Sequence, residues 1–217
     1  MIEVQHLTKK YGKHLALDDL SFTIEKGQIY GFLGPNGAGK STTMNIMTGY
    51  ISATSGEVLI DGHSILDEPE KAKKSIGYLP EIPPLYLDMT VMEYLKFVAE
   101  LKKIPKDKRP AEVRKASTLV KLNDVSNRLI RNLSKGYKQR TGLAAAVLGF
   151  SDIIILDEPT VGLDPKQIIE IRQLIRKLAK DHTVILSSHI LAEVQEICDY
   201  ILIITKGKLV GSGTPEE

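Results

Sequence analysis

The chain has 217 residues, of which 42% are hydrophobic and 26% are charged, and its 29 basic and 27 acidic side chains give a formal net charge of +2. This length predicts one large domain, or one domain with an inserted lobe, and the composition excludes a disordered or fibrous chain. The even charge argues against a polybasic surface for nucleic acid or membranes, the single cysteine excludes an internal disulfide, and no apolar run approaches the ~20 residues that cross a bilayer.

Short apolar runs alternate with helical patterns along the chain, as is typical of an α/β fold. Residues 21–24 alternate between apolar and polar, which predicts a strand, and the continuous apolar run 28–33 predicts a strand buried on both faces. Similar patterns predict further strands over residues 56–60, 75–79, 152–157, 183–186, 200–204 and 208–211. Cys198 has apolar neighbours, and we expect a small buried side chain there rather than a reactive thiol.

The middle of the chain has a helical character. Thr90-Val91-Met92-Glu93 has the pattern of a capping box, and apolar residues then recur at helical spacing to Leu101. Further helical patterns begin with a proline near the first position and cover residues 110–122 and 164–178. We therefore expect one domain over residues 1–217, with a helical lobe of about 85–150 inserted into a core of about 1–84 and 151–217.

A phosphate-binding pattern, G-x-x-x-x-G-K-[ST], occurs between a predicted strand and a predicted helix, in the sequence Gly34-Pro35-Asn36-Gly37-Ala38-Gly39-Lys40-Ser41-Thr42. Glycines let backbone N–H groups turn inward around an anion, and the helix that begins near Lys40 adds its partial positive charge. Lys40 would supply a cation to the β- and γ-phosphates, and the Ser41 hydroxyl could coordinate Mg²⁺. A chance match in a glycine-rich turn is the alternative, which the flanking strand and helix disfavour.

Two carboxylates and a histidine follow predicted buried strands. Asp157 and Glu158 should point in different directions, because side chains alternate along a strand, and they lie at the carboxyl end, where α/β sheets bind ligands. One could hold Mg²⁺ while the other polarises an attacking water; taken alone, such a pair would be two solvated acids. His189, in Ser187-Ser188-His189, could donate a hydrogen bond to the γ-phosphate or the water, although a lone histidine is more often structural.

A further motif changes the interpretation of the whole chain. Leu133-Ser134-Lys135-Gly136-Tyr137-Lys138-Gln139-Arg140 alone would be a serine-capped helix start. Together with the phosphate loop, Asp157-Glu158-Pro159-Thr160, Gly162-Leu163-Asp164 and His189, in that order, it resembles the ATP-binding cassette (ABC) family, specifically the nucleotide-binding subunit of an ABC transporter. The resemblance covers essentially the whole chain. It implies a P-loop NTPase core of mainly parallel sheet flanked by helices, an N-terminal antiparallel β subdomain and an inserted α-helical lobe.

The resemblance also implies roles for single residues. Tyr11, in Lys10-Tyr11-Gly12, would stack on adenine, although it could simply be an exposed tyrosine near a turn. Asp157 would be the Mg²⁺ carboxylate, Glu158 the general base, and His189 the switch histidine beside the γ-phosphate. Residues 134–137 would contact ATP held by the opposite subunit. Asp164, with Gly162 and Leu163, would cross the dimer interface.

The sequence departs from the family pattern at two places. The usual signature is L-S-G-G-Q, and here Lys135 and Tyr137 replace a glycine and the glutamine, while Ser134 and Gly136 remain. Glu81 stands where the family usually has a glutamine. Its carboxylate could still coordinate Mg²⁺, but the amide donor is lost and a charge is added. In these variants the chain resembles bacterial efflux-type cassettes, which points to export.

The resemblance implies a Mg²⁺-dependent ATPase that dimerises around ATP with a second ABC subunit and drives a separate membrane permease for export. Such a subunit would be cytoplasmic and peripheral on the inner face of the cell membrane, with no nucleic-acid partner.

The alternative is a non-transport ABC ATPase acting on DNA or the ribosome, although the segment between Lys40 and Leu133 leaves no room for a long coiled coil and no second cassette follows. A P-loop kinase or GTPase would not account for the signature motif. The sequence leaves open the cargo, the choice of homodimer or heterodimer, and whether the chain continues past Glu217.

An apolar, proline-stiffened segment, Ile82-Pro83-Pro84-Leu85-Tyr86-Leu87, follows Glu81 directly. We expect part of it to stay exposed and, with the helix from Val91, to form a groove for a short permease helix. A core-forming loop is the alternative, and it would bury Leu85, Tyr86 and Leu87 completely.

Overall fold

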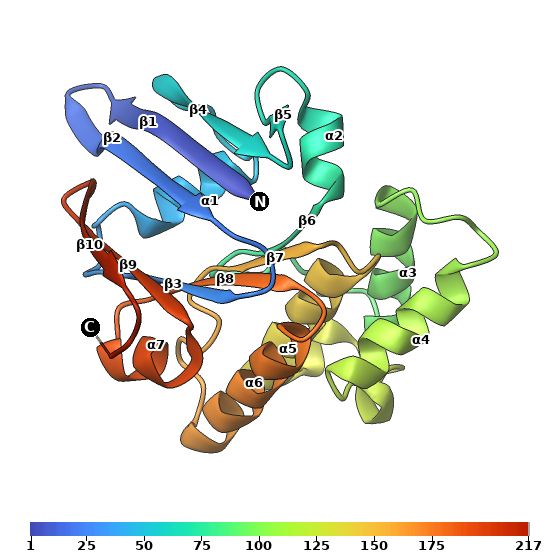
Figure 1. The fold of residues 1–217 in the computed structure, drawn as a ribbon. Helices are drawn as coiled ribbons and strands as arrows, with labels where there is room; N and C mark the ends of the chain where they lie inside the picture. The colour runs from blue at the N-terminus through green and yellow to red at the C-terminus, as the bar shows by residue number, and fades with distance from the viewer. Residues whose placement is uncertain (217) are drawn as a thin grey trace.

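The computed structural model describes residues 1–216, so Glu217, the last residue of the predicted domain, lies outside the described residues. Two sheets lie one above the other in Figure 1, with α1 (Lys40–Met47) between them and further helices below and to one side. The upper sheet has four strands in the order β2-β1-β4-β5, and the lower has six in the order β10-β9-β3-β8-β7-β6. No helix within residues 1–216 combines the length and the apolar composition needed to cross a bilayer.

The upper sheet is antiparallel throughout, as expected for the N-terminal subdomain. Its strands are β1 (Ile2–Tyr11), β2 (His14–Ile24), β4 (Ser55–Ile60) and β5 (His63–Ser64). The sequence predicted β4 and the end of β2, but missed β1, β5 and the first part of β2. Register shifts interrupt the pairing of β1 and β2, and His6 and Asp19 adopt positive φ angles of 50° and 54°. These irregularities break the period-2 pattern by which a strand is recognised.

The lower sheet carries the predicted buried strands. They are β3 (Ile29–Leu33), β6 (Ile76–Leu79), β7 (Ile153–Leu156), β8 (Thr183–Ser188), β9 (Tyr200–Thr205) and β10 (Lys208–Gly213). All pair in parallel except β10, an antiparallel edge strand on β9. Every residue of β7 and β8 is buried, which explains the continuous apolar runs 153–156 and 184–186. The α/β fold with a mainly parallel sheet is thus confirmed.

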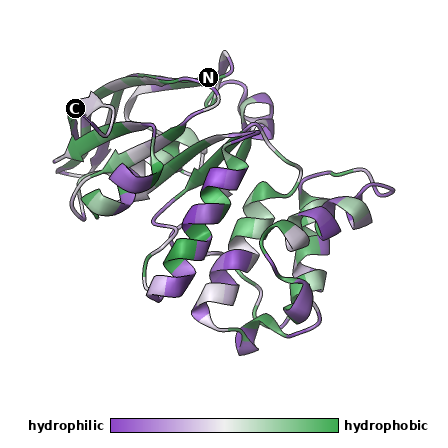
Figure 2. Cartoon of the chain, turned by 60° about the horizontal axis from the view of Figure 1, so that its bottom comes forward, coloured by the Kyte–Doolittle hydropathy of each residue, from purple (hydrophilic) through white to green (hydrophobic). Residues whose placement is uncertain are grey.

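The helices cover the lower sheet and build the lobe. Between β6 and β7 come α3 (Val91–Leu101), α4 (Arg109–Leu119) and α5 (Lys135–Val147), with short 3-10 turns at Asn123–Val125 and Ile130–Asn132. Of the remaining helices, α6 (Pro165–Leu178) was predicted from the sequence. The short helices α2 (Pro69–Lys74) and α7 (Leu191–Ile197) were not predicted. In Figure 2 the helices alternate between green and purple, as expected of helices with one face on the core.

Local signals set the helix boundaries. The capping box at Thr90 is confirmed, since its Oγ1 accepts from the Glu93 N–H at 3.2 Å and its own N–H donates to Glu93 Oε2 at 2.8 Å. A second capping box joins Asp164 and Gln167 at the start of α6. The prediction that α4 runs to Leu122 was too long. Lys121 has a φ of 58°, in the left-handed region that ends a helix.

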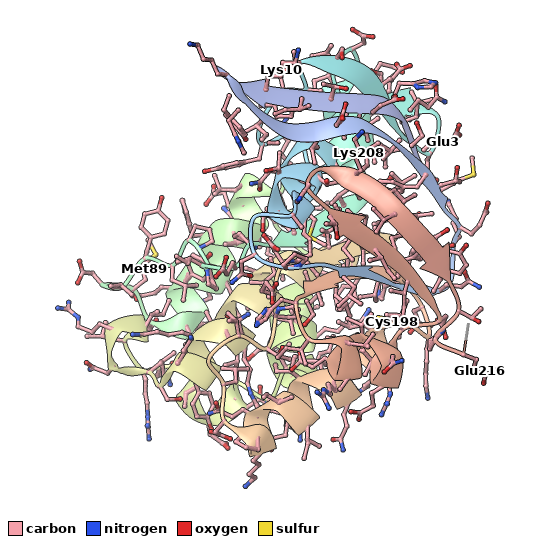
Figure 3. The ribbon with its side chains drawn as sticks, turned by 90° about the vertical axis from the view of Figure 1, so that its left-hand side faces the viewer. Glu3, Lys10, Met89, Cys198, Lys208 and Glu216 are labelled. Carbon is pink, nitrogen blue, oxygen red and sulfur yellow. The ribbon has the colours of Figure 1, made fainter. Side chains whose placement is uncertain are left out.

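Two apolar cores hold these layers together. One fills the space between the sheets and includes Phe32, Met44 and Val58, while the other joins the underside of the lower sheet to the lobe. Cys198 belongs to the second core, and burial raises the pKa of its thiol to about 12, so the predicted buried cysteine is confirmed (labelled in Figure 3). At the edge of the layers Lys208 pairs with Asp18 of β2 at 3.0 Å, near the label of Lys208 in the same figure.

One lysine joins two helices of the lobe. Lys102, just past α3, donates from Nζ to the carbonyl oxygens of Ala146 and Leu148, at 2.9 and 2.6 Å, where α5 ends. Burial of the ammonium group lowers the pKa of Lys102 to about 8, although much of its side chain is exposed to solvent. The folded state therefore binds this proton less tightly than the unfolded state does.

Between pH 8 and 10.5, Lys102 should stay protonated only in the unfolded chain, and stability should rise with pH. We compare the free energy of unfolding of the native protein with that of Lys102→Met. Between pH 7.5 and pH 10 this difference should change by about 1 kcal/mol in favour of the native protein, a value that includes a reduction for solvent screening. Urea unfolding at the two pH values measures this difference. Lys103→Met, which removes an exposed neighbouring charge, is the control. A difference that stays constant with pH would contradict the prediction.

Candidate functional site

A glycine-rich loop joins β3 to α1. Ala38 N–H donates to Pro35 O at 3.1 Å, and Gly37 and Gly39 adopt φ angles of 79° and 108°. A Cβ on Gly39 would lie 2.6 Å from the Leu17 side chain, so only glycine fits where the loop passes β2. Because α1 begins at Lys40, its free N–H groups face the concave side of the loop.

This loop forms one wall of a cavity of about 400 Å³. The sequence predicted most of its lining: Tyr11, Asn36, Gly37, Gly39, Lys40, Ser41, Thr42, Glu81, Glu158 and His189. These residues come from five separate stretches of chain. The cavity is therefore assembled by the fold from the segments that the motifs singled out.

Lys40 is a buried cation at the bottom of the loop. Its side chain is 5% exposed, and Nζ donates to Gly34 O at 2.7 Å and to Pro35 O at 3.2 Å. Nζ also lies 3.5 Å from Glu158 Oε1. The carbonyl oxygens and the carboxylate balance a charge that would otherwise be costly to bury, and an anion in the cavity could replace them.

The two carboxylates after β7 diverge, as predicted. Asp157 Oδ1 accepts from Ser41 Oγ at 3.1 Å and from Ser187 Oγ at 2.6 Å. Glu158 turns the other way, and its Oε2 lies 3.0 Å from His189 Nδ1. Glu158 has a φ of 47°, a strained conformation for a residue with a side chain, and its N–H donates to Ser187 Oγ at 2.8 Å.

The oxygen atoms beside the loop suit a magnesium ion. Mg²⁺ prefers hard oxygen ligands and in nucleotide sites takes one or two protein groups together with water and phosphate oxygens. The Ser41 hydroxyl and the Asp157 carboxylate already face each other, and the exposed Glu81 carboxylate lines the same cavity. No cluster of three or more His, Cys, Asp or Glu side chains that would bind a metal by themselves occurs within residues 1–216. The residues fit an ion that arrives with a phosphate ligand.

A second group of predicted residues lies outside this cavity. Ser134 caps α5, where its Oγ accepts from the Tyr137 N–H at 3.4 Å, and Asp164 caps α6. The two helix starts are adjacent, because a Cβ on Gly136 would lie 2.4 Å from Gln167 Nε2 and one on Gly162 would lie 2.0 Å from Lys135 Nζ. Residues 134–137 and Asp164 therefore share one surface, which is separate from the cavity of the same chain.

Four residues of the site were not predicted from the sequence. His14, Ala16 and Val161 also line the cavity. The antiparallel pairing of His14 with Tyr11 places His14 at the cavity, and no sequence motif indicates this pairing. Ser187 bonds to both Asp157 and the Glu158 backbone. Its position at the end of a buried strand, just before His189, was the available signal.

The comparisons with known proteins agree with this geometry. A family model described as "ABC transporter" matches residues 17–161. The chain is 42% identical to the uncharacterized ABC transporter ATP-binding protein YhcH of Bacillus subtilis and 40% identical to the bacitracin transport ATP-binding protein BcrA of Bacillus licheniformis, in each case over 97% of this chain and 68% of the relative. It is 36% identical to the lantibiotic transport ATP-binding protein SrtF of Streptococcus pyogenes, over 97% of this chain and 89% of the relative.

Solved structures show the same fold. A dimeric ATP-binding cassette in a post-hydrolysis state, bound to ADP and Pi, superimposes with a TM-score of 0.89 and 26% identity, over 99% of both chains. Part of an ABC transporter complex from Clostridium perfringens superimposes with a TM-score of 0.88 and 29% identity, over 99% of this chain and 88% of that chain.

Replacing Lys40 with alanine should weaken the binding of ATP at least about tenfold, because a charged hydrogen bond to phosphate is worth roughly 1.5–3 kcal/mol. Isothermal titration calorimetry measures the affinity. Lys177→Ala, which removes an exposed lysine of α6, should bind ATP as the native protein does. Equal affinities of the native protein and Lys40→Ala would contradict the assignment of the loop as a phosphate site.

Proposed function

Because the chain belongs to the ABC transporter family of ATP-binding subunits, we propose that it binds ATP with Mg²⁺, pairs with a second cassette around the nucleotide and drives a separate membrane permease. The observation that carries this proposal is the meeting of Lys40, Glu158 and His189 at one cavity beside the Ser41–Asp157 pair. These are the groups that phosphoryl transfer to water requires for positioning and charge stabilisation.

In the proposed complex the cavity holds one ATP molecule. Tyr11 is half-exposed at its mouth and offers a ring face for adenine, while the loop amides and Lys40 surround the phosphates. Lys40 exchanges its bonds to Gly34 and Pro35 for phosphate oxygens. Ser41, Asp157 and Glu81 would hold Mg²⁺. When bound, the ion neutralises charge on the β- and γ-phosphate oxygens.

Glu158 is the proposed general base. Its carboxylate would take the proton of the attacking water, and His189 Nδ1, at 3.0 Å from Oε2, would keep the carboxylate turned towards the γ-phosphate. The strained backbone of Glu158 supports this role, because such strain persists where the surroundings determine a functional geometry.

The surface formed by residues 134–137 and Asp164 is the proposed contact with the second cassette. These residues lie outside the cavity of their own chain, so they would reach nucleotide only across an interface. The likeness to a dimeric cassette with ADP and Pi supports this arrangement. ATP would then favour the closed pair through its higher affinity for that state, and hydrolysis would release it.

A groove beside the lobe is the proposed docking site of the permease. It has a volume of about 320 Å³ and lies between the segment that follows Glu81 and α3, with Pro84, Tyr86, Tyr94 and Phe97 among its lining residues. Ile82 and Tyr86 are 83% and 54% exposed, and Leu85 is only partly buried, so the expected exposure is confirmed and the core-forming alternative is wrong. An apolar groove of this kind suits a short amphipathic helix.

The names of the relatives support the remaining details. Those named for bacitracin and lantibiotic transport suggest a peptide antibiotic as cargo, moved outwards by a permease, with this subunit on the cytoplasmic face of the membrane. The near balance of 29 basic and 27 acidic side chains gives no large excess of positive charge for binding nucleic acid, and no observation favours a role on DNA or the ribosome.

Glu158→Gln should lower steady-state ATP hydrolysis at least about 100-fold, because an amide cannot take the proton from water. ATP binding should persist, and dimers should accumulate in Mg-ATP, as measured by light scattering after size exclusion. Glu112→Gln, in α4, is the control. Undiminished turnover in Glu158→Gln would remove Glu158 from the role of base, and a monomer in the presence of retained ATP would contradict the proposed pairing.

Tyr86→Asp should prevent docking of the permease without changing ATP affinity, because it places a charge in the apolar groove. Copurification of the membrane subunit from detergent-solubilised membranes of the source cells, quantified by mass spectrometry, measures docking. Val210→Asp, at an exposed apolar position of β10, should retain the same subunit. Equal recovery with both variants would contradict the groove as the docking site.

A further inference from the structure

We propose that Glu193 of α7 is a positioning residue for ATP hydrolysis, which holds the loop of Glu158 and the loop of His189 in a fixed relation. The inference rests on the proposed function of that pair. Glu193 itself does not line the cavity and is not expected to touch nucleotide.

A buried carboxylate joins the two loops. Glu193 is 7% exposed, and its Oε2 accepts from Thr160 Oγ1 at 3.0 Å and from Ser188 Oγ at 2.9 Å. Thr160 is two residues after Glu158, and Ser188 immediately precedes His189. One oxygen atom thus ties together the ends of β7 and β8 that carry the reacting groups.

The other side of the carboxylate faces a cation. Glu193 Oε1 lies 3.4 Å from Arg172 Nη2 of α6, and Arg172 also pairs with Glu196. An ionised carboxylate only accepts hydrogen bonds, so it can serve two hydroxyl donors and a guanidinium at once. A glutamine there would turn an NH₂ group towards Arg172 or towards the hydroxyls. An alanine would leave both hydroxyls without this acceptor and Arg172 with Glu196 as its remaining carboxylate partner.

The strained Glu158 backbone needs such support. Its N–H is held by Ser187 Oγ, and the next carbonyl, Pro159 O, accepts from the buried Gln139 side chain at 3.0 Å. Glu193 holds the following residue, Thr160. Three successive residues are therefore fixed from three different elements, which is how a sparsely populated conformation is maintained.

The same carboxylate also fixes the histidine loop. Ser188 Oγ donates to Glu193 and accepts from the Ile190 N–H at 3.1 Å, so one hydroxyl spans the turn that contains His189. The 3.0 Å contact between His189 and Glu158 depends on both loops keeping their places. A displacement of about 1 Å at reacting groups can cost ~10²-fold in rate.

The phosphate loop belongs to a different part of the site. It is built on β3 and α1, and no hydrogen bond within residues 1–216 joins it to Glu193. Loss of Glu193 should therefore impair the chemical step and leave ATP binding almost unchanged. A residue with only a structural role would lower the melting temperature and leave the kcat of the folded protein intact.

Steady-state kinetics of Glu193→Ala test the inference. We expect kcat to fall at least about tenfold, while KM and the Kd for ATP change less than about twofold. Glu196→Ala is the matched control, because Glu196 also pairs with Arg172 but its side chain is half-exposed and reaches neither Thr160 nor Ser188. It should keep the native kcat.

A second route does not depend on the stability of Glu193→Ala. Thr160→Val combined with Ser188→Ala leaves the Glu193–Arg172 pair in place and should reproduce the loss of kcat, and adding Glu193→Ala should lower it little further. A folded Glu193→Ala variant with native kcat, a rise in KM at unchanged kcat, or fully additive losses would overturn the inference. A native protein without ATPase activity would overturn the proposed function instead.

Discussion

The parallel pairing of β3, β8 and β7 is the constraint on which the site depends. The register pairs Leu33 with Ser188 and Leu156 with Leu186, so the carboxyl ends of the three strands meet at one edge of the sheet. The phosphate loop, the Asp157–Glu158 pair and His189 each follow one of these strands. Because every residue of the three strands except the half-buried Leu33 is buried, their register is determined by the apolar core and cannot slip without exposing it.

The second organising feature is a group of buried charged side chains that are compensated by nearby partners. Lys40, Asp157, Glu158 and Glu193 are all buried within a short distance of this edge, and each has partners of opposite charge or hydrogen-bond donors. A buried ion pair seldom adds net stability, but removing one partner leaves the other uncompensated. The network is therefore better explained by the geometry that it imposes on the phosphate loop and the two neighbouring loops than by its contribution to folding.

The molecule also separates its interaction surfaces. The proposed nucleotide cavity, the surface around Ser134 and Asp164, and the groove beside Tyr86 lie on different parts of the chain, yet α5 is common to two of them. Ser134 begins this helix, Gly142 and Ala146 line the groove, and Gln139 between them bonds to Pro159 beside the proposed base. The helix α5 thus connects the groove to the surface of residues 134–137 and to the loop of Glu158.

Much of the fold and most of the site could be predicted from the sequence. The continuous apolar runs of the core strands, the capping boxes at Thr90 and Asp164 and the glycine-rich loop before Lys40 are local signals, because each depends on residues close together in the chain. The ordered set of motifs, from the phosphate loop to His189, indicated the family.

The tertiary structure alone decided the features that depend on contacts between separate segments of the chain. The irregular pairing of β1 with β2 brings His14 to the cavity, and hydrogen bonds join Thr160, in the loop after β7, to Glu193 of α7 and through it to Ser188 of β8. No spacing in the sequence marks these partners, because hydrogen bonds between loops depend on the register of a sheet and the placement of a helix. The sequence by itself determined which groups are available for the chemistry, and the packing of the strands and helices decided which of them meet.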